Sequence, residues 1–171
     1  MTADPAYYQP QLFGGEHVEI EQTSDSWCTP EVILDPVREF YGEIDLDPCS
    51  NEGSTVGATV TYTLADDGLA HPWQGRVYCN PPYSDCAAWL ARCAEMPSRG
   101  GEAIALPKGD WSTKWWWDHV RTASARCLLK TRVSFCLTEG ATTAPFPSVL
   151  VYWGPRVDDF ARVFGPLGEV I

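Results

Sequence analysis

The stretch Arg76-Val77-Tyr78-Cys79-Asn80-Pro81-Pro82-Tyr83 decides how the rest of the chain is interpreted. It begins as a short β-branched and aromatic strand, which the double proline stops because a proline cannot donate to a sheet ladder or continue a helix. Ser84 and Asp85 then begin a helix with an acidic first turn. The stretch therefore predicts that Asn80, the Pro81 carbonyl and the Tyr83 ring lie rigidly at the carboxyl end of a strand, where open α/β sheets bind ligands.

These groups suit the chemistry of an exocyclic aromatic amine, such as N6 of adenine. Such an amine is a poor nucleophile, because its lone pair is delocalised into the ring. The side-chain oxygen of Asn80 and the carbonyl of Pro81 can accept its two N–H groups and localise that lone pair, as preorganised groups do where charge develops. Pro82 keeps the loop rigid, and Tyr83 can stack on the base. The alternative interpretation is a simple turn after a strand.

Two short segments with polar residues, which we call islands, precede this stretch. Thr29 and Pro30 predict a helix start, with Thr29 as the N-cap and Pro30 in the first helical position, and such a helix end can bind an anion. A short strand around Ile44 and Leu46 then ends at Asp47-Pro48-Cys49, which places a carboxylate at the end of the first strand. The alternative for the first island is a helix cap without a ligand.

Residues 58–64 alternate and are β-branched, which predicts a strand. The turn that follows carries Asp67 next to a glycine, a pair that also forms turns without any function. Few residues separate Asp47 from Asn80, too few for two full strand–helix crossovers. The doubly wound core is therefore predicted to be trimmed, with one strand–strand step made directly.

The remainder of the chain predicts alternating elements. We expect a helix at about 85–96, a buried strand at 102–107, a helix capped by Ser112 or Thr113, a strand pair at 128–129 and 133–135, and a last strand at 149–153. Lys108 and Trp111 fall in the loop after the buried strand, at the same sheet edge as Asn80, and Lys114 follows them. Residues 1–26 predict an N-terminal arm, with one edge strand around 17–20, that is flexible or used in self-association. Residues 27–155 form the predicted catalytic domain, and residues 156–171 a C-terminal tail.

Composition limits the class of protein. A chain of 171 residues with 44% hydrophobic residues suits one domain, and no apolar run reaches the roughly 20 residues of a membrane span. Seven cysteines without a CxxC pair predict reduced thiols in the cytoplasm, and the three histidines are not spaced as metal ligands, so we expect no metal. The net charge of −11 opposes avid nucleic-acid binding, but eight of the twelve basic residues lie between residues 92 and 132. That segment predicts either a solvated surface or a basic face beyond the Asn80 loop.

The Asn-Pro-Pro-Tyr tetrapeptide resembles the catalytic loop of amino-group methyltransferases that use S-adenosylmethionine. The ordered set of islands resembles the phage-type DNA N-6-adenine methyltransferase family over residues of about 25–154. The islands that carry this resemblance are Trp27-Cys28-Thr29-Pro30, Asp45-Leu46-Asp47-Pro48-Cys49, Asp67-Gly68-Leu69, Cys79-Asn80-Pro81-Pro82-Tyr83-Ser84, Lys114-Trp115-Trp116 and Ala144-Pro145-Phe146-Pro147-Ser148.

The resemblance implies a trimmed class I (Rossmann-like) α/β methyltransferase fold, with a mostly parallel sheet flanked by helices. It also implies S-adenosylmethionine as the methyl donor and adenine N6 in double-stranded DNA as the acceptor, in the cytoplasm of a bacterial host or phage-infected cell. By matching position, the cofactor residues are Thr29, Pro30, Asp47, Pro48, Cys49 and Asp67. The catalytic residues are Asn80, Pro81, Pro82 and Tyr83, and the DNA-side residues are Lys108, Trp111 and Lys114. The glycine-rich loop usual after the first strand is missing here.

Several alternatives stay open from the sequence. The same loop serves enzymes that methylate RNA bases or a protein glutamine amide, and related enzymes modify cytosine N4. A binding protein that kept the fold and lost the cofactor is the non-enzyme alternative, which the acidic charge and the missing glycines support. No segment is long enough for a separate target-recognition domain. Sequence specificity is thus expected to be low, or to come from loops around 108–117 and 137–147 or from a second subunit, such as a homodimer partner.

Overall fold

The computed structural model describes residues 23–137 and 140–171. Most of the predicted N-terminal arm, with its edge strand around 17–20, lies outside the described residues. The helices are η1 (Ser24–Ser26), α1 (Glu31–Tyr41), η2 (Gly68–Ala70), α2 (Cys86–Glu95), η3 (Met96–Arg99), η4 (Trp116–Val120) and α3 (Val157–Phe164). The strands are β1 (Leu46–Asp47), β2 (Val60–Thr61), β3 (Arg76–Cys79), β4 (Glu102–Ala105), β5 (Ala125–Leu129), β6 (Ser134–Cys136), β7 (Ala141–Thr143), β8 (Val149–Trp153) and β9 (Gly168–Val170).

Seven strands form one central sheet in the order β2-β1-β3-β4-β8-β5-β9, and β6 and β7 form a separate hairpin. β2, β1, β3 and β4 are mutually parallel, whereas β8 runs antiparallel to both β4 and β5. β5 therefore points the same way as β4, and β9 is antiparallel to it. The prediction of a mixed α/β domain with a mostly parallel sheet is confirmed. No helix in the part of the chain that the structure describes is long and apolar enough to cross a membrane.

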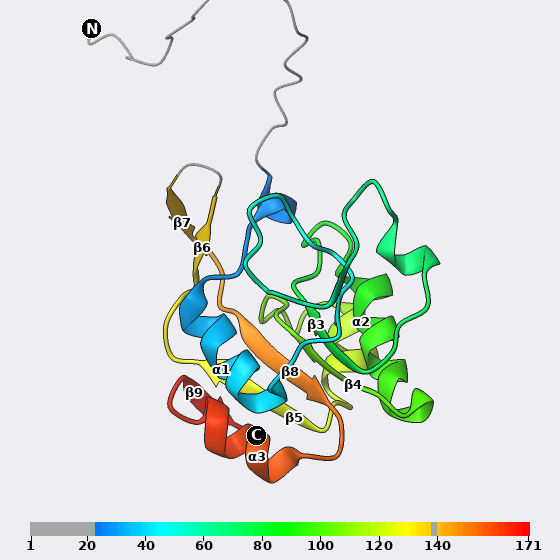
Figure 1. The fold of residues 1–171 in the computed structure, drawn as a ribbon. Coiled ribbons are helices and arrows are strands. Elements are labelled where there is room, and N and C mark those ends of the chain that lie inside the picture. The colour runs from blue at the N-terminus through cyan, green and yellow to red at the C-terminus, as the bar shows by residue number, and fades with distance from the viewer. Residues whose placement is uncertain (1–22, 138–139) are drawn as a thin grey trace, which may run out of the picture.

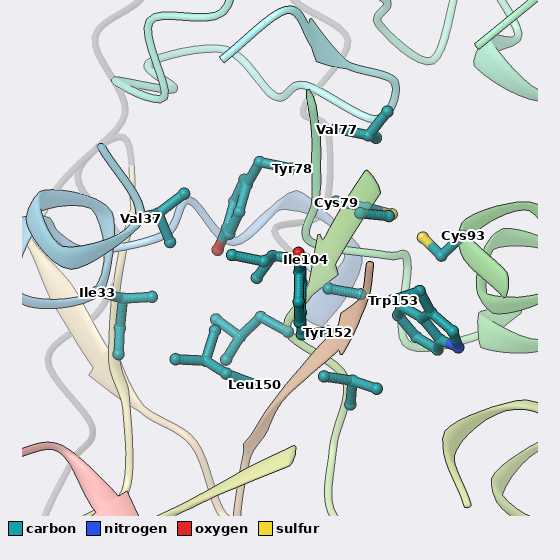
Figure 2. Close-up of a cluster of buried hydrophobic side chains, with 14 of the residues drawn as sticks. Ile33, Val37, Val77, Tyr78, Cys79, Cys93, Ile104, Leu150, Tyr152 and Trp153 are labelled. Atoms are coloured by element: carbon teal, nitrogen blue, oxygen red, sulfur yellow. The ribbon is translucent and has the colours of Figure 1, made fainter. Parts of the chain in front are cut away.

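Helices cover both faces of the sheet. α1 and α3 lie side by side on one face, and α2 lies on the other (Figure 1). Side chains alternate between the faces along each strand. Figure 2 shows Tyr78 and Ile104 on the side of α1, whereas Cys79 and Trp153 lie toward Cys93 of α2. All five side chains are buried, so the sheet is the centre of the hydrophobic core.

The connections around β1 and β2 are short. No α-helix lies between β1 and β2 or between β2 and β3, which agrees with the direct step predicted from the short spacing. The strand predicted at 58–64 is reduced to Val60 and Thr61. It ends there because the amide and hydroxyl of Thr63 both donate to the carboxylate of Asp66, 2.8 and 2.7 Å away, and so form a turn.

Residues 156–171 are not a tail. They form α3 and β9, and the rings of Phe160 and Phe164 are fully buried. Phe40 of α1 packs edge-on against Phe160 at 6.0 Å between ring centroids. Arg156 donates to the carboxylate of Glu102 at 2.6 Å, which ties the start of the segment to β4. The C-terminal segment therefore completes the core on the α1 face.

Two other predicted elements differ from the structure. The helix expected after Ser112 or Thr113 begins at residue 114 but is short and irregular, because residues 114 and 115 are α-helical and η4 is π-helical. The hydroxyl of Thr113 does not cap it and donates instead to the carbonyl of Asp110 at 2.8 Å. The indole nitrogen of Trp117 in η4 donates to the carbonyl of Trp111 at 2.9 Å, so η4 packs on its own preceding loop. The strands predicted at 128–129 and 133–135 do not pair with each other, since β5 pairs with β8 and β9, and β6 pairs with β7.

Candidate active site

The Asn-Pro-Pro-Tyr loop follows β3 at the carboxyl edge of the sheet, as predicted. The side-chain amide of Asn80 donates from Nδ2 to the carbonyl of Trp27 at 2.8 Å. The hydroxyl of Tyr83 lies 3.4 Å from Oδ1 of Asn80 and donates to the carbonyl of Leu106 at 3.3 Å. Among the described residues, no donor occupies the carbonyl of Pro81. The predicted acceptor pair, Oδ1 of Asn80 and this carbonyl, therefore lies on one loop, and Oδ1 has the hydroxyl of Tyr83 within 3.4 Å.

Residues 23–29, which we call the strap, cross the carboxyl edge next to this loop. The carboxylate of Asp25 accepts hydrogen bonds from the backbone amide of Ser84, at 3.0 Å, and from its hydroxyl. Nδ2 of Asn51 donates to the carbonyls of Asp25 and Trp27 at 3.0 and 3.4 Å. The strap therefore connects the loop after β1 to the Asn-Pro-Pro-Tyr loop.

Four aromatic rings meet where the strap, the loop and the β6–β7 hairpin come together. The ring of Trp27 lies 6.1 Å from Tyr83 in an edge-on arrangement and is stacked on Phe146 at 6.1 Å. Phe135 and Phe146 each meet Tyr83 edge-on, at 6.0 and 5.0 Å. Only 7% of Tyr83 is exposed. This aromatic cluster encloses the ring that the sequence assigns to base stacking.

Asp47 lies at the end of β1 with only 3% of its surface exposed. One carboxylate oxygen accepts the amide of Cys49 at 3.3 Å, and no cation pairs with it in the described part of the chain. Burial raises the pKa of Asp47 to about 6, which hydrogen bonds from Cys49, Ser50 and Ser54 only partly offset. The thiol of Cys49 lies 3.2 Å from the carbonyl of Asn80, so the ends of β1 and β3 are adjacent.

Thr29 does not cap α1. Pro30 occupies the N-cap position instead, and its carbonyl accepts the amides of Ile33 and Leu34 at 3.0 and 3.1 Å. The hydroxyl of Thr29 lies 2.9 Å from the hydroxyl of Tyr78, because a buried phenol needs a partner. Thr29 and Pro30 remain beside the carboxyl edge, but the predicted capping geometry is wrong.

A small cavity joins these residues. It has a volume of about 10 Å³ and is lined by Trp27, Cys28, Thr29, Asp47, Cys49, Ser50, Asn51, Ser54, Val56 and Asn80. That volume holds roughly one water molecule, whereas pockets for small molecules measure roughly 300–1,000 Å³. A nucleoside or a cofactor does not fit while the strap is in this position. The polar lining consists of a buried carboxylate, hydroxyls and amides, which match the amino and hydroxyl groups of a nucleoside.

Asp67 lies in the turn beside the loop after β1. Its backbone is left-handed, with φ of 52°, and its side chain is exposed. The next residue, Gly68, packs so tightly that a Cβ atom there would lie 1.8 Å from the carbonyl of Pro48. Only glycine fits at this position, and it holds the turn against Pro48. Asp67 is therefore near the predicted cofactor residues but does not line the small cavity.

Lys108, Trp111 and Lys114 lie outside the small cavity. Lys108 follows β4 and forms an antiparallel bridge with Ser148. The side chains of Trp111 and Lys114 are exposed, at 67% and 88%, and Lys114 pairs with Asp118. The structure brings Lys108 to the carboxyl edge and leaves the other two on the adjoining surface.

The structure adds residues that the sequence analysis did not assign to the site. Asp25 and Asn51 hold the strap, and no local pattern marks them because their contacts bridge distant segments. Phe146 lies in the segment Ala144-Pro145-Phe146-Pro147-Ser148, and the prolines on both sides of it are a sequence signal for a rigid loop. The hydroxyl of Ser148 in that segment is buried without a hydrogen-bond partner in the described residues.

A larger cavity of about 560 Å³ lies at the opposite, amino edge of the parallel strands. Its charged groups are paired with one another. Arg76 donates to the carboxylate of Asp45 at 2.9 Å, and Arg156 to that of Glu102 at 2.6 Å. Among the described residues, the charged groups that line this space all have ion-pair partners, so we interpret these charges as structural.

The structure is that of a mixed α/β protein with a mostly parallel central sheet, and the candidate site lies at the carboxyl ends of its parallel strands, where such sheets commonly bind ligands. The family model described as DNA N-6-adenine-methyltransferase (Dam) matches residues 17–159, and the chain belongs to this family. It is also similar to an Escherichia coli (strain K12) protein named "Putative methyltransferase YfdM". The two are 31% identical over 72 residues, which cover 38% of this chain and 78% of the relative.

Proposed function

We propose that this protein transfers a methyl group from S-adenosylmethionine to N6 of adenine in DNA. The family supports methyl transfer to DNA adenine in general. The observation that carries the assignment to these residues is the orientation of Asn80. Its Nδ2 donates to Trp27, so Oδ1 is left as an acceptor at the carboxyl edge. The mostly parallel sheet with this edge also supports a trimmed form of the class I (Rossmann-like) methyltransferase fold.

The acceptor amine is held by two oxygens in this proposal. Oδ1 of Asn80 and the carbonyl of Pro81 accept its N–H groups and localise the nitrogen lone pair for attack. Pro82 keeps both oxygens in place because neither proline can rotate about φ. Proximity and orientation then supply much of the acceleration. No cysteine nucleophile is required, since the acceptor is an amine rather than a ring carbon.

The cofactor residues in this proposal are Asp47, with the neighbouring Pro48 and Cys49, Thr29 with Pro30, and Asp67. S-adenosylmethionine would supply an electrophilic methyl group on a sulfonium. The buried carboxylate of Asp47 has no cation beside it in residues 23–137 and 140–171, and it would accept hydrogen bonds from an amino or hydroxyl group of such a ligand. Because the cavity measures only about 10 Å³, binding requires the strap to move outward.

The adenine is proposed to leave the duplex and to stack against Tyr83, which requires Trp27 to leave the aromatic cluster when the strap moves outward. Flipping a base costs a few kcal/mol, which stacking and hydrogen bonds in the pocket offset. Lys108, Trp111 and Lys114 are proposed to contact the DNA beside the site. The exposed ring of Trp111 and the cationic Lys114 are suited to a nucleic-acid surface.

The test is to incubate the protein with S-adenosylmethionine carrying a labelled methyl group and with DNA, RNA or protein in separate reactions. Digestion and mass spectrometry then identify the labelled product. We expect N6-methyldeoxyadenosine from DNA. If the label is found instead in N4-methylcytosine, in RNA or in a protein glutamine, the methyl acceptor is that group and not adenine N6 of DNA. No transfer, together with no calorimetric binding of S-adenosylhomocysteine at millimolar concentration, would favour a binding protein that has lost the cofactor.

A further inference from the structure

We infer that the Trp27 carbonyl of the strap is a positioning group for the catalytic amide and that it requires a hydrogen-bond donor at position 80. This inference rests on the proposed role of Asn80 and goes beyond it. It explains why an asparagine, which carries both a donor and an acceptor, stands at this position. A carboxylate offers only acceptors.

The hydrogen-bond network defines which way the amide points. The Trp27 carbonyl can only accept, so the group 2.8 Å from it is the NH₂ of Asn80. The other end, Oδ1, then faces the hydroxyl of Tyr83, a group that can donate to it at 3.4 Å. The contact with Trp27 decides the orientation, and the contact with Tyr83 is compatible with it, because a phenol hydroxyl can donate or accept. A reversed amide would place two oxygens against each other at the strap.

The Trp27 carbonyl is itself held firmly. It accepts from Asn51 as well as from Asn80, and Asp25 anchors the preceding residues of the strap to Ser84. The following residue, Cys28, exchanges two backbone hydrogen bonds with Cys136, at 3.0 and 2.9 Å. Anchors on both sides keep the carbonyl from turning away when its partner changes.

An aspartate at position 80 would therefore meet the carbonyl with a charged oxygen. The repulsion favours the protonated acid, so the pKa of that carboxyl would be raised in the folded protein. The protonated form restores the arrangement, because its O–H donates to Trp27 and its other oxygen remains an acceptor. The Asn80→Asp variant should thus be inactive when ionised and regain activity as the pH falls.

Other titratable groups around position 80 must be separated from this effect. These are Asp47, Cys49 and Cys79 at the ends of the neighbouring strands, Tyr83 on the loop, Asp25 and Cys28 on the strap, and Cys136 on the hairpin. Asp47 has a pKa of about 6 and lines the same small cavity as position 80, so the two carboxyls of the variant titrate as a coupled pair. The measured quantity is therefore the ratio of the single-turnover rates of Asn80→Asp and Asn80 proteins at each pH, both in the Asp47→Asn background, where this coupling is absent.

The experiment measures methyl transfer to DNA by the Asn80 and Asn80→Asp proteins, both in the Asp47→Asn background, between pH 5 and 8.5. We expect the ratio of the Asn80→Asp rate to the Asn80 rate to rise about tenfold per pH unit on acidification, as the protonated fraction does above the pKa. A ratio that stays constant would overturn the inference. Asn51→Asp in the same background is the matched control, because it removes a second donor to the same carbonyl. An equal rise in the control would also overturn the inference, since it would reflect strap stability rather than amide orientation.

Thermal unfolding of the same variants gives a readout independent of activity. A carboxyl whose folded-state pKa is raised stabilises the fold fully below its unfolded pKa, and this stability is lost as pH rises through the folded pKa. The melting temperature of Asn80→Asp should therefore approach that of the Asn80 protein in the same background at low pH and fall below it at high pH. A pH-independent difference would contradict the bond to Trp27. If the wild type transfers no methyl group to DNA, the proposed function fails, and this unfolding test still decides whether position 80 requires a donor.

Discussion

Asp45 directly precedes β1 and Asp47 is its last residue, and the surroundings of these two carboxylates differ sharply. Asp45 accepts hydrogen bonds from the side chain of Arg76 at 2.9 Å, which lowers the pKa of Asp45. Asp47 is buried with no cation beside it among the described residues, and its pKa is raised to about 6. The first carboxylate stabilises the fold, whereas the second destabilises it at neutral pH.

The same difference separates the two cavities of the molecule. The space of about 560 Å³ at the amino edge is bordered by ion pairs that satisfy one another. The space of about 10 Å³ at the carboxyl edge is bordered by a buried carboxylate and the oriented amide of Asn80. The candidate site is therefore identified by its buried polar groups, which have no charged partner among the described residues, and not by the volume of the cavity.

The largest expected effect is on Asn80. The Asn80→Ala variant removes one of the two acceptors for the amine, and loss of a single preorganised group typically lowers kcat about 10²–10³-fold. Binding of S-adenosylhomocysteine should stay nearly unchanged in calorimetry, which shows that the variant is folded. Full activity in this variant would refute the role of the loop.

The next largest effect is expected at Asp47, where a substitution should increase the stability of the fold and weaken cofactor binding. Burial raises its pKa from an ordinary value of 3.8 to about 6, so its carboxylate destabilises the fold at pH 8 by about 2–3 kcal/mol. Asp47→Asn should raise the melting temperature at pH 8, with a gain that disappears below about pH 4, and should weaken binding of S-adenosylhomocysteine. If the variant is less stable at pH 8 and binds normally, the carboxylate is structural.

The smallest effect is expected at the amino edge. Asp45→Asn breaks a pair in which the side chain of Asp45 is 37% exposed, so the cost should be only about 0.5–1 kcal/mol. Because the pKa of Asp45 is lowered, its contribution is present above the unfolded pKa and is lost as pH falls through the folded pKa. Urea unfolding at pH 7 and pH 3 measures this. Methyl-transfer activity should not change in this variant. A large loss of activity would indicate that the active site lies at the amino edge of the sheet.

Much of the fold follows from local pattern in the sequence. The double proline after β3, the alternating and buried strands β4 and β8, and the face of α2 are local signals that tertiary contacts reinforce. The sequence does not show that residues 156–171 belong to the core, because their burial depends on Phe40 and β5, which are distant in sequence. The cap predicted at Thr29 is wrong because the competing partner, the hydroxyl of Tyr78, becomes adjacent only in the folded sheet.

The candidate site is predictable only in part for the same reason. Residue types that must stand in a fixed local order, such as Asn80 to Tyr83, are visible in the sequence. The contact of Asp25 with Ser84 joins residues 59 positions apart, and the contact of Asn51 with Asp25 joins residues 26 positions apart. No periodic pattern in the sequence predicts such contacts. The closure of the cavity by Trp27 is likewise a property of packing rather than of a motif.

The central claim is that the carboxyl edge, and not the larger cavity, binds the cofactor. Hydrogen exchange measured by mass spectrometry with and without S-adenosylmethionine tests this directly. We predict protection at residues 47–54 and 80–83, together with a change in exchange of the strap. Protection concentrated at residues 75–76, 100–102 and 154–155, with the carboxyl edge unchanged, would contradict the account.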